Sequence, residues 1–114
     1  RLLQTAIKNC VIYLSQETFA ELEEVIFRPK FDRYFTAEDI RTAFLEDLHL
    51  HAVFAEITTH VTDCSDPKDN IFLSLARSVN AHYLVSGDKK HLLSMNPYHG
   101  IEILNPAEFY EKIV

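Results

Sequence analysis

The chain is poor in glycine, proline and cysteine, and it has no tryptophan. Two glycines and four prolines among 114 residues argue against a loop-rich or fibrous protein. Two cysteines, outside any Cys-x-x-Cys pair, are too few for a disulfide framework or a zinc ribbon. No apolar run approaches the roughly 20 residues that cross a bilayer, and no signal peptide is visible. We therefore expect a reduced, cytoplasmic protein without a membrane partner.

Positive charge is also scarce. Eleven Lys and Arg against 17 Asp and Glu give a net charge of −6, whereas a protein held to nucleic acid by charge alone is normally basic. This composition disfavours tight non-specific binding of nucleic acid. It leaves two routes to such a ligand: an acidic site that recruits metal ions, or a partner protein that supplies the positive charge.

What remains is an ordinary globular composition, with 47% hydrophobic residues, which suits a single domain with one core. Short apolar runs predict strands at 10–14, 82–86 and 101–104, and a strand or extended chain at 57–61. Helix-start signals predict helices after Ser15, Thr36, Asp66-Pro67 and Asn105-Pro106, with a short helix at 90–94. The end of the second helix is not visible, because its last turns run into residues 52–55. Since helices separate the strands, we expect an α/β fold with a parallel sheet covered on both faces.

Carboxylates follow the expected strands, where ligands bind in parallel sheets. Asp88 comes directly after the run at 82–86, across Gly87. Asp66 and Asp69 open a helix, and at 100° per residue Asp69 falls about 90° from the centre of the apolar stripe, at the border between core and cleft. Asn70 points away from that border, although it lies near the helix end. Turn and capping roles explain each of these acidic residues taken singly.

A further carboxylate is expected from the helix after Ser15. Glu17 and Glu24 lie opposite its apolar face, while Glu21 and Glu23 flank that face on its two sides. Helix geometry leaves open which of the flanking pair reaches the cleft. Carboxylates that meet at one sheet edge destabilise a fold unless a cation is present. Hard oxygen ligands suit Mg²⁺ or Mn²⁺, and such ions activate water against a phosphodiester.

Four segments occur in a distinctive order: AELEEVIFRPKF at 20–31, DPKDNIFLSLA at 66–76, AHYLVSGDK at 81–89 and GIEILNPAEF at 100–109. Together they resemble the PIN-domain family, and most closely its toxin-like branch from prokaryotic toxin–antitoxin systems. The resemblance implies a three-layer α/β/α, Rossmann-like fold and a ribonuclease that depends on Mg²⁺ or Mn²⁺. Its implied partners are RNA, an antitoxin protein and a second copy of the chain.

The resemblance also implies roles for individual residues, and it favours Glu21 over Glu23. Catalytic metal ligands would be Glu21, Asp69 and Asp88, with Asp66 as a further metal ligand and Ser86 and Asn70 in support. The family pattern opens with a strand that ends in an Asp-Thr-Asn-like motif, which this chain does not show. We therefore expect one PIN-like domain over residues 1–114 that is incomplete at its N-terminus.

The sequence allows two alternatives to the nuclease. The first is a catalytically inactive PIN-like module that binds RNA or protein. The second is an α/β enzyme that handles phosphate groups and is unrelated to this family, but only Gly87 and Gly100 are present, which leaves no glycine-rich phosphate loop.

Overall fold

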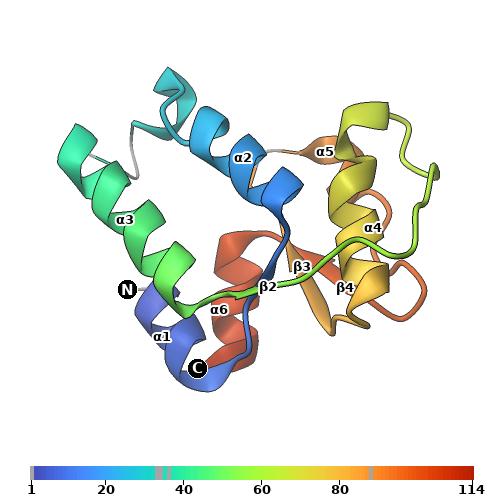
Figure 1. The fold of residues 1–114 in the computed structure, drawn as a ribbon. Helices are drawn as coiled ribbons and strands as arrows, with labels where there is room; N and C mark the ends of the chain where they lie inside the picture. Colours follow the sequence, from blue (N-terminus) through green and yellow to red (C-terminus); the bar gives the residue numbers. More distant parts are fainter. Residues whose placement is uncertain (1, 33–34, 36, 88) are drawn as a thin grey trace.

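A computed structural model describes residues 2–32, 35, 37–87 and 89–114 of the chain. Figure 1 shows short strands at the centre with helices around them. The helices are α1 (Leu2–Asn9), α2 (Gln16–Val25), α3 (Glu38–His51), α4 (Asn70–Ser78), α5 (Lys90–Leu93) and α6 (Pro106–Ile113), and two 3₁₀ turns span Pro29–Phe31 and Pro67–Asp69. The strands are β1 (Tyr13–Leu14), β2 (Val53–Phe54), β3 (Tyr83–Val85) and β4 (Glu102–Leu104).

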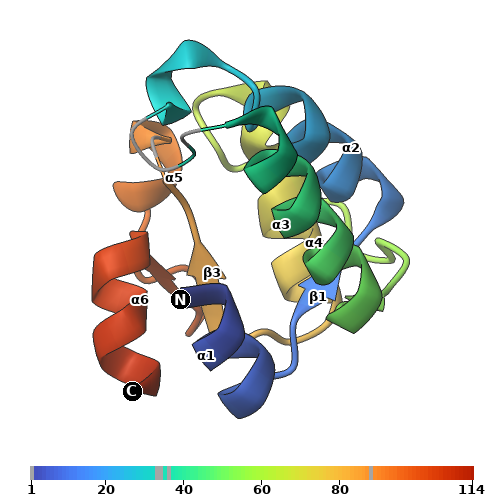
Figure 2. The same ribbon diagram turned by 90° about the vertical axis from the view of Figure 1, so that its left-hand side faces the viewer.

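The strands form two parallel pairs. Tyr13 of β1 is in register with Val53 of β2, and Leu84 of β3 is in register with Ile103 of β4. This confirms the expected α/β class with parallel strands. The pairs belong to separate two-stranded sheets, and Figure 2 shows β1 and β3 apart, with α1 and α6 beside β3. A single sheet inside three layers stays a prediction.

Three helix-start signals in the sequence are confirmed by hydrogen bonds. The Ser15 side chain accepts a bond from the Thr18 N–H at 3.1 Å and caps α2. The Asp66 carboxylate accepts from the Lys68 N–H at 3.2 Å and caps the 3₁₀ turn before α4. Asn105 accepts from the Glu108 N–H at 2.8 Å at the start of α6. Each cap satisfies a backbone donor that the first helical turn leaves unpaired.

The segment 57–61, expected as a strand or as extended chain, is not a strand. The strand of this region lies earlier, at Val53–Phe54, where the Val53 N–H donates to the Ile12 carbonyl at 2.8 Å. The later segment is held by serine hydroxyls on α4 instead. Ser78 Oγ accepts from the Thr58 and Thr59 N–H groups, each at 3.0 Å. Side chains therefore satisfy the donors that a strand would have paired with a neighbouring strand.

One helix end differs from the expectation, and one expected helix cap lies outside the described residues. Helix α2 ends at Val25 rather than near Arg28, because Arg28 adopts the extended backbone that a following proline favours. Thr36, expected to cap α3, lies outside the described residues. Helix α3 begins at Glu38 with Ala37 in the capping position and no side-chain capping bond.

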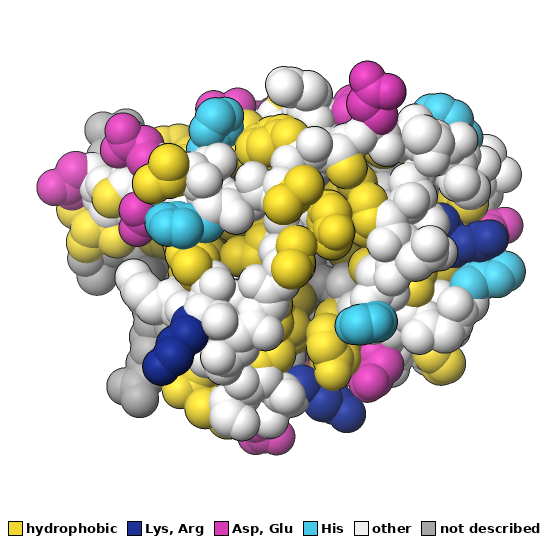
Figure 3. Space-filling view, turned by 60° about the horizontal axis from the view of Figure 1, so that its bottom comes forward, with side chains coloured by type: hydrophobic (Ala, Val, Ile, Leu, Met, Phe, Trp, Pro, Cys, Tyr) yellow, Lys and Arg dark blue, Asp and Glu magenta, His cyan; other side chains and the backbone are white. Residues whose placement is uncertain are grey.

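The core lies between α4, α5 and β4. Leu73, Leu92 and Ile103 are its most completely buried large side chains, and a second cluster joins Ala6, Leu104 and Phe109. On the face drawn in Figure 3, apolar side chains gather in a band through the middle, with charged residues toward the outline. Within the part of the chain that the structure describes, no helix has the length and apolar character needed to span a membrane.

Candidate active site

A cleft of about 470 Å³ lies between the later part of α2 and the segments that begin α4 and α5. Three segments line it: the later part of α2 with the turn after it, the 3₁₀ turn before α4, and the start of α5. Its acidic lining residues are Glu21, Glu24, Asp66 and Asp69, and its basic ones are Arg28, Lys30, Lys68, Lys89, Lys90 and His91. These three segments are far apart in the sequence, so only the fold brings their charged side chains into one cleft.

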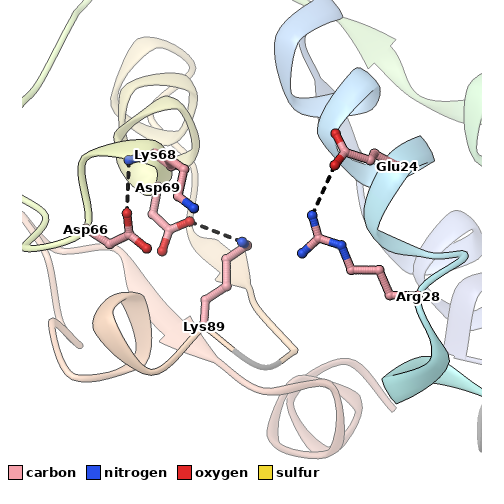
Figure 4. Close-up of polar contacts among 6 residues, drawn as sticks. All are labelled: Glu24, Arg28, Asp66, Lys68, Asp69 and Lys89. Atoms are coloured by element: carbon pink, nitrogen blue, oxygen red, sulfur yellow. Dashed lines mark hydrogen bonds and ion pairs between the residues drawn. The ribbon is translucent and has the colours of Figure 1, made fainter.

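Asp69 is the buried carboxylate of the cleft. It ends the 3₁₀ turn Pro67–Asp69, so the Asp66 cap and the proline together fix the backbone that presents it. Only 3% of the residue is exposed, yet it lines the cleft, which agrees with its expected place at the border of core and cleft. Its Oδ1 lies 3.1 Å from the Nζ of Lys89, and Figure 4 shows this ion pair beside the capped turn.

The neighbours of Asp69 have different surroundings. Asp66 is half-buried and lines the same cleft, where one of its carboxylate oxygens accepts the Lys68 N–H. Asn70 is not among the lining residues. Its Oδ1 accepts a bond from the Cys64 N–H at 2.9 Å, so it ties the preceding loop to the start of α4.

Helix α2 forms the opposite wall. Glu21 is half-buried and lines the cleft, whereas Glu23 is exposed and lies outside the lining. Glu24 also lines the cleft, but its side chain is 70% exposed and its Oε1 lies 3.1 Å from Arg28. Figure 4 shows this Glu24–Arg28 pair across from Asp66, Asp69 and Lys89. Helix geometry left open the choice between Glu21 and Glu23, and in the structure Glu21 is the one that lines the cleft.

The segment after β3 carries two more predicted site residues. Ser86 is buried, and its N–H donates to the Leu104 carbonyl at 2.9 Å. Its hydroxyl oxygen has no hydrogen-bond partner among the described residues. Asp88, predicted as a catalytic metal ligand, lies outside the described residues.

Sequence reasoning underestimated the basic side of this cleft. In the sequence, Lys89-Lys90-His91 and the basic residues near Arg28 are typical of solvated charge runs, although such runs can also contact RNA phosphates. Five of the 11 Lys and Arg residues line the cleft, against four described Asp and Glu residues. The cleft is therefore locally more basic than a chain of net charge −6 suggests. The sequence does contain a signal for this basic side, because Lys68 and Lys89 each lie next to an acidic residue of the motifs.

The acidic side chains that line the cleft are of the chemical type that a hard divalent cation prefers. The donors that line the cleft are carboxylate oxygens, which Mg²⁺ and Mn²⁺ prefer. The charge of the buried Asp69 is already balanced by a cation, the ammonium of Lys89. Within the described ranges, no three His, Cys, Asp or Glu side chains lie close enough together to hold a metal ion.

Parallel strands with a charged cleft beside the segment that follows β3 place the chain in a class of α/β proteins that bind ligands near strand ends. Comparison with known families narrows this class. The PIN domain model matches residues 1–90 of the 114-residue chain. The chain belongs to the PIN domain family, and its fold is nuclease-like. Searches of curated proteins and of solved structures each found no match.

Proposed function

We propose that this chain is a divalent-metal-dependent ribonuclease of the PIN type. The observation that supports the proposal is the cleft itself, which Glu21 and Asp66 line together with the buried Asp69. Asp88 is proposed as the remaining metal ligand and Ser86 and Asn70 as supporting residues. A Mg²⁺ or Mn²⁺ ion bound by these carboxylates would supply the charge that activates water against a phosphodiester.

Residues of the chain position the carboxylate of the cleft and supply cationic side chains for an RNA backbone. The Asp66 cap and Pro67 fix the turn that holds Asp69, so this carboxylate is positioned before any ligand arrives. Arg28, Lys68 and Lys90 line the same cleft, and cationic side chains there favour phosphate groups. The burial of Asp69 removes water from one side of the carboxylate, which strengthens its interaction with any cation.

The finer proposals rest on the family resemblance of the motif segments. We propose that residues 1–114 act as one domain with a three-layer α/β/α arrangement, in the cytoplasm, as the toxin of a toxin–antitoxin pair. An antitoxin protein and a second copy of the chain are the proposed protein partners, and the net charge of −6 suits a basic surface on the antitoxin. Growth arrest on expression, relieved by Asp69→Asn, is the expected sign of the toxin role.

The nuclease proposal is tested by cleavage of a fluorescently labelled single-stranded RNA with Mn²⁺ or with EDTA. Cleavage should require the metal. Asp69→Asn and Glu21→Gln should each lower the rate by about 100-fold or more, because metal-assisted stabilisation of the transition state contributes several kcal/mol. Glu23→Gln is the matched control, since Glu23 lies on the same helix, is exposed, and is outside the cleft lining. Cleavage that persists unchanged in EDTA would refute the proposal.

A second candidate function is a non-catalytic module that binds RNA or protein. Two observations favour it: the described part of the chain contains no cluster of three metal-ligating side chains, and Lys89 already compensates Asp69. The same RNA distinguishes the two functions. RNA that is bound, but not cut with either metal, supports the module.

A further inference from the structure

Lys89 forms the only described ion pair of the buried Asp69. The two side chains come from segments twenty residues apart, the turn before α4 and the start of α5. Their exposures differ: 4% of the Asp69 side chain is accessible, against 29% of the Lys89 side chain. The carboxylate is therefore held inside the protein, while the lysine reaches it from the solvent side.

The backbone of Lys89 is anchored, but its side chain has room to leave. Its carbonyl accepts the N–H groups of Leu92 and Leu93, each at 3.0 Å, as α5 begins. The Nζ atom lies 5.6 Å from the centre of the Phe72 ring, a contact that holds the ammonium near Asp69. A flexible four-carbon stem with an exposed side allows the ammonium to turn toward water while the backbone stays in place.

We propose that Lys89 is a built-in counter-ion that occupies Asp69 until a divalent cation displaces it. The inference rests on the proposed function, because it assigns Asp69 to that cation. A buried carboxylate needs a compensating positive charge in both states. The ammonium supplies it when the cleft holds no metal, and the divalent ion supplies it afterwards. Lys89 is thus a positioning residue that lowers the affinity for metal and keeps the empty cleft folded.

The test is isothermal titration of Mn²⁺ into the purified chain and its variants. Removal of the competing ammonium in Lys89→Met should tighten Mn²⁺ binding by about tenfold or more, since a charge-assisted hydrogen bond to a buried group contributes about 1.5–3 kcal/mol. Lys90→Met is the matched control: Lys90 is adjacent, exposed and lines the same cleft, so its loss removes an equal charge without opening the pair. Its effect should stay within about threefold.

Thermal unfolding gives a second, independent measurement. Without metal, Lys89→Met should unfold at a lower temperature than the unaltered chain, because Asp69 is left uncompensated. Mn²⁺ should raise the unfolding temperature of Lys89→Met by more than it raises that of the unaltered chain. Lys89→Arg keeps the positive charge, so its unfolding temperature, with and without Mn²⁺, should match that of the unaltered chain. If Lys89→Met does not fold, Lys89→Gln keeps an amide donor to Asp69 without the charge and takes its place.

The outcomes separate the two proposals. The role of Lys89 is overturned if the unaltered chain and both variants bind Mn²⁺ with equal affinity. It is also overturned if the affinity increases equally in Lys89→Met and Lys90→Met. In both cases the proposed metal site is retained. A destabilised Lys89→Met that Mn²⁺ does not rescue shows a purely structural ion pair and also overturns it. If Mn²⁺ binds neither the unaltered chain nor the Lys89 variants, the proposed metal-dependent function fails, and the inference fails with it.

Discussion

The Asp69–Lys89 ion pair should be more costly to break from one end than from the other. Lys89→Met leaves a carboxylate whose side chain is 4% exposed without its cation, and an uncompensated buried charge costs about 3–5 kcal/mol. Asp69→Asn leaves an ammonium whose side chain is 29% exposed. That ammonium can turn to solvent, so the expected cost is only the lost charge-assisted bond, about 1.5–3 kcal/mol.

Equilibrium unfolding in urea measures both costs. Urea is preferred to guanidinium chloride because a salt screens the charges under study, and EDTA keeps divalent ions from replacing Lys89. The double variant Asp69→Asn with Lys89→Met removes both charges, so it should recover about 2 kcal/mol relative to Lys89→Met alone. Lys90→Met, a loss of charge at an exposed neighbour, should stay within about 0.5 kcal/mol of the unaltered chain.

The reasoning depends on the difference in burial, so the order of the two costs is its test. An Asp69→Asn variant as destabilised as Lys89→Met would refute it, because the two stranded charges would then have equal access to water. A double variant that is no more stable than Lys89→Met would also refute it. In that case the carboxylate would not be the group that carries the penalty.

Two further predictions concern the core around the cleft. Leu73→Ala, at a fully buried position of α4, should lower the free energy of unfolding by about 3 kcal/mol or more, measured by urea unfolding, whereas Ala43→Ser at an exposed site should not. Burial, followed by the hydrogen bond to Asp63, raises the pKa of Tyr98 above its ordinary value of 10.0, while Arg77 opposes the shift. The unfolded chain then loses this proton first, so stability should fall as the pH rises above 10.0, and Tyr98→Phe should reduce that fall.

Local signals in the sequence were sufficient where a helix start depends on a few adjacent residues. Ser15, Asp66 with Pro67, and Asn105 with Pro106 each cap a helix or turn as expected. These signals work because the cap bonds an N–H two or three residues away, so both partners are visible in the sequence. Two of these caps also position the site, since they begin the segments that carry Glu21 and Asp69.

Contacts between distant segments were not predictable in the same way. The apolar residues 52–55 follow a helix without a break, and only pairing with β1 makes Val53 and Phe54 a strand. The segment 57–61 has the composition of a strand, but hydroxyls of Ser74 and Ser78 satisfy its backbone donors at Thr58, Thr59 and Val61. Composition cannot show that a serine elsewhere in the chain is in reach.

The same reason explains why the acidic half of the cleft was predicted and the basic half was not. Glu21 and Asp69 were identified by their motif positions, and the structure brings both to the cleft. Lys89 was interpreted as part of a solvated run, since its neighbours in sequence are also charged. Only the fold reveals that its partner is Asp69, which lies in another motif. A basic residue that follows an acidic motif is therefore worth testing as its counter-ion before it is assigned to solvent.

The ion pair also links the two halves of the proposed reaction. An RNA backbone is anionic, so the carboxylates that line the cleft oppose its binding while the lysines and Arg28 favour it. While Lys89 is paired with Asp69, its positive charge is neutralised by that carboxylate. If a divalent cation takes over Asp69, the ammonium is released at the start of α5, on the rim of the same cleft as Lys90 and His91. Filling the carboxylate site then adds a free cation where a phosphate would lie, so metal and RNA should bind with positive cooperativity, and Lys89→Met should weaken that coupling.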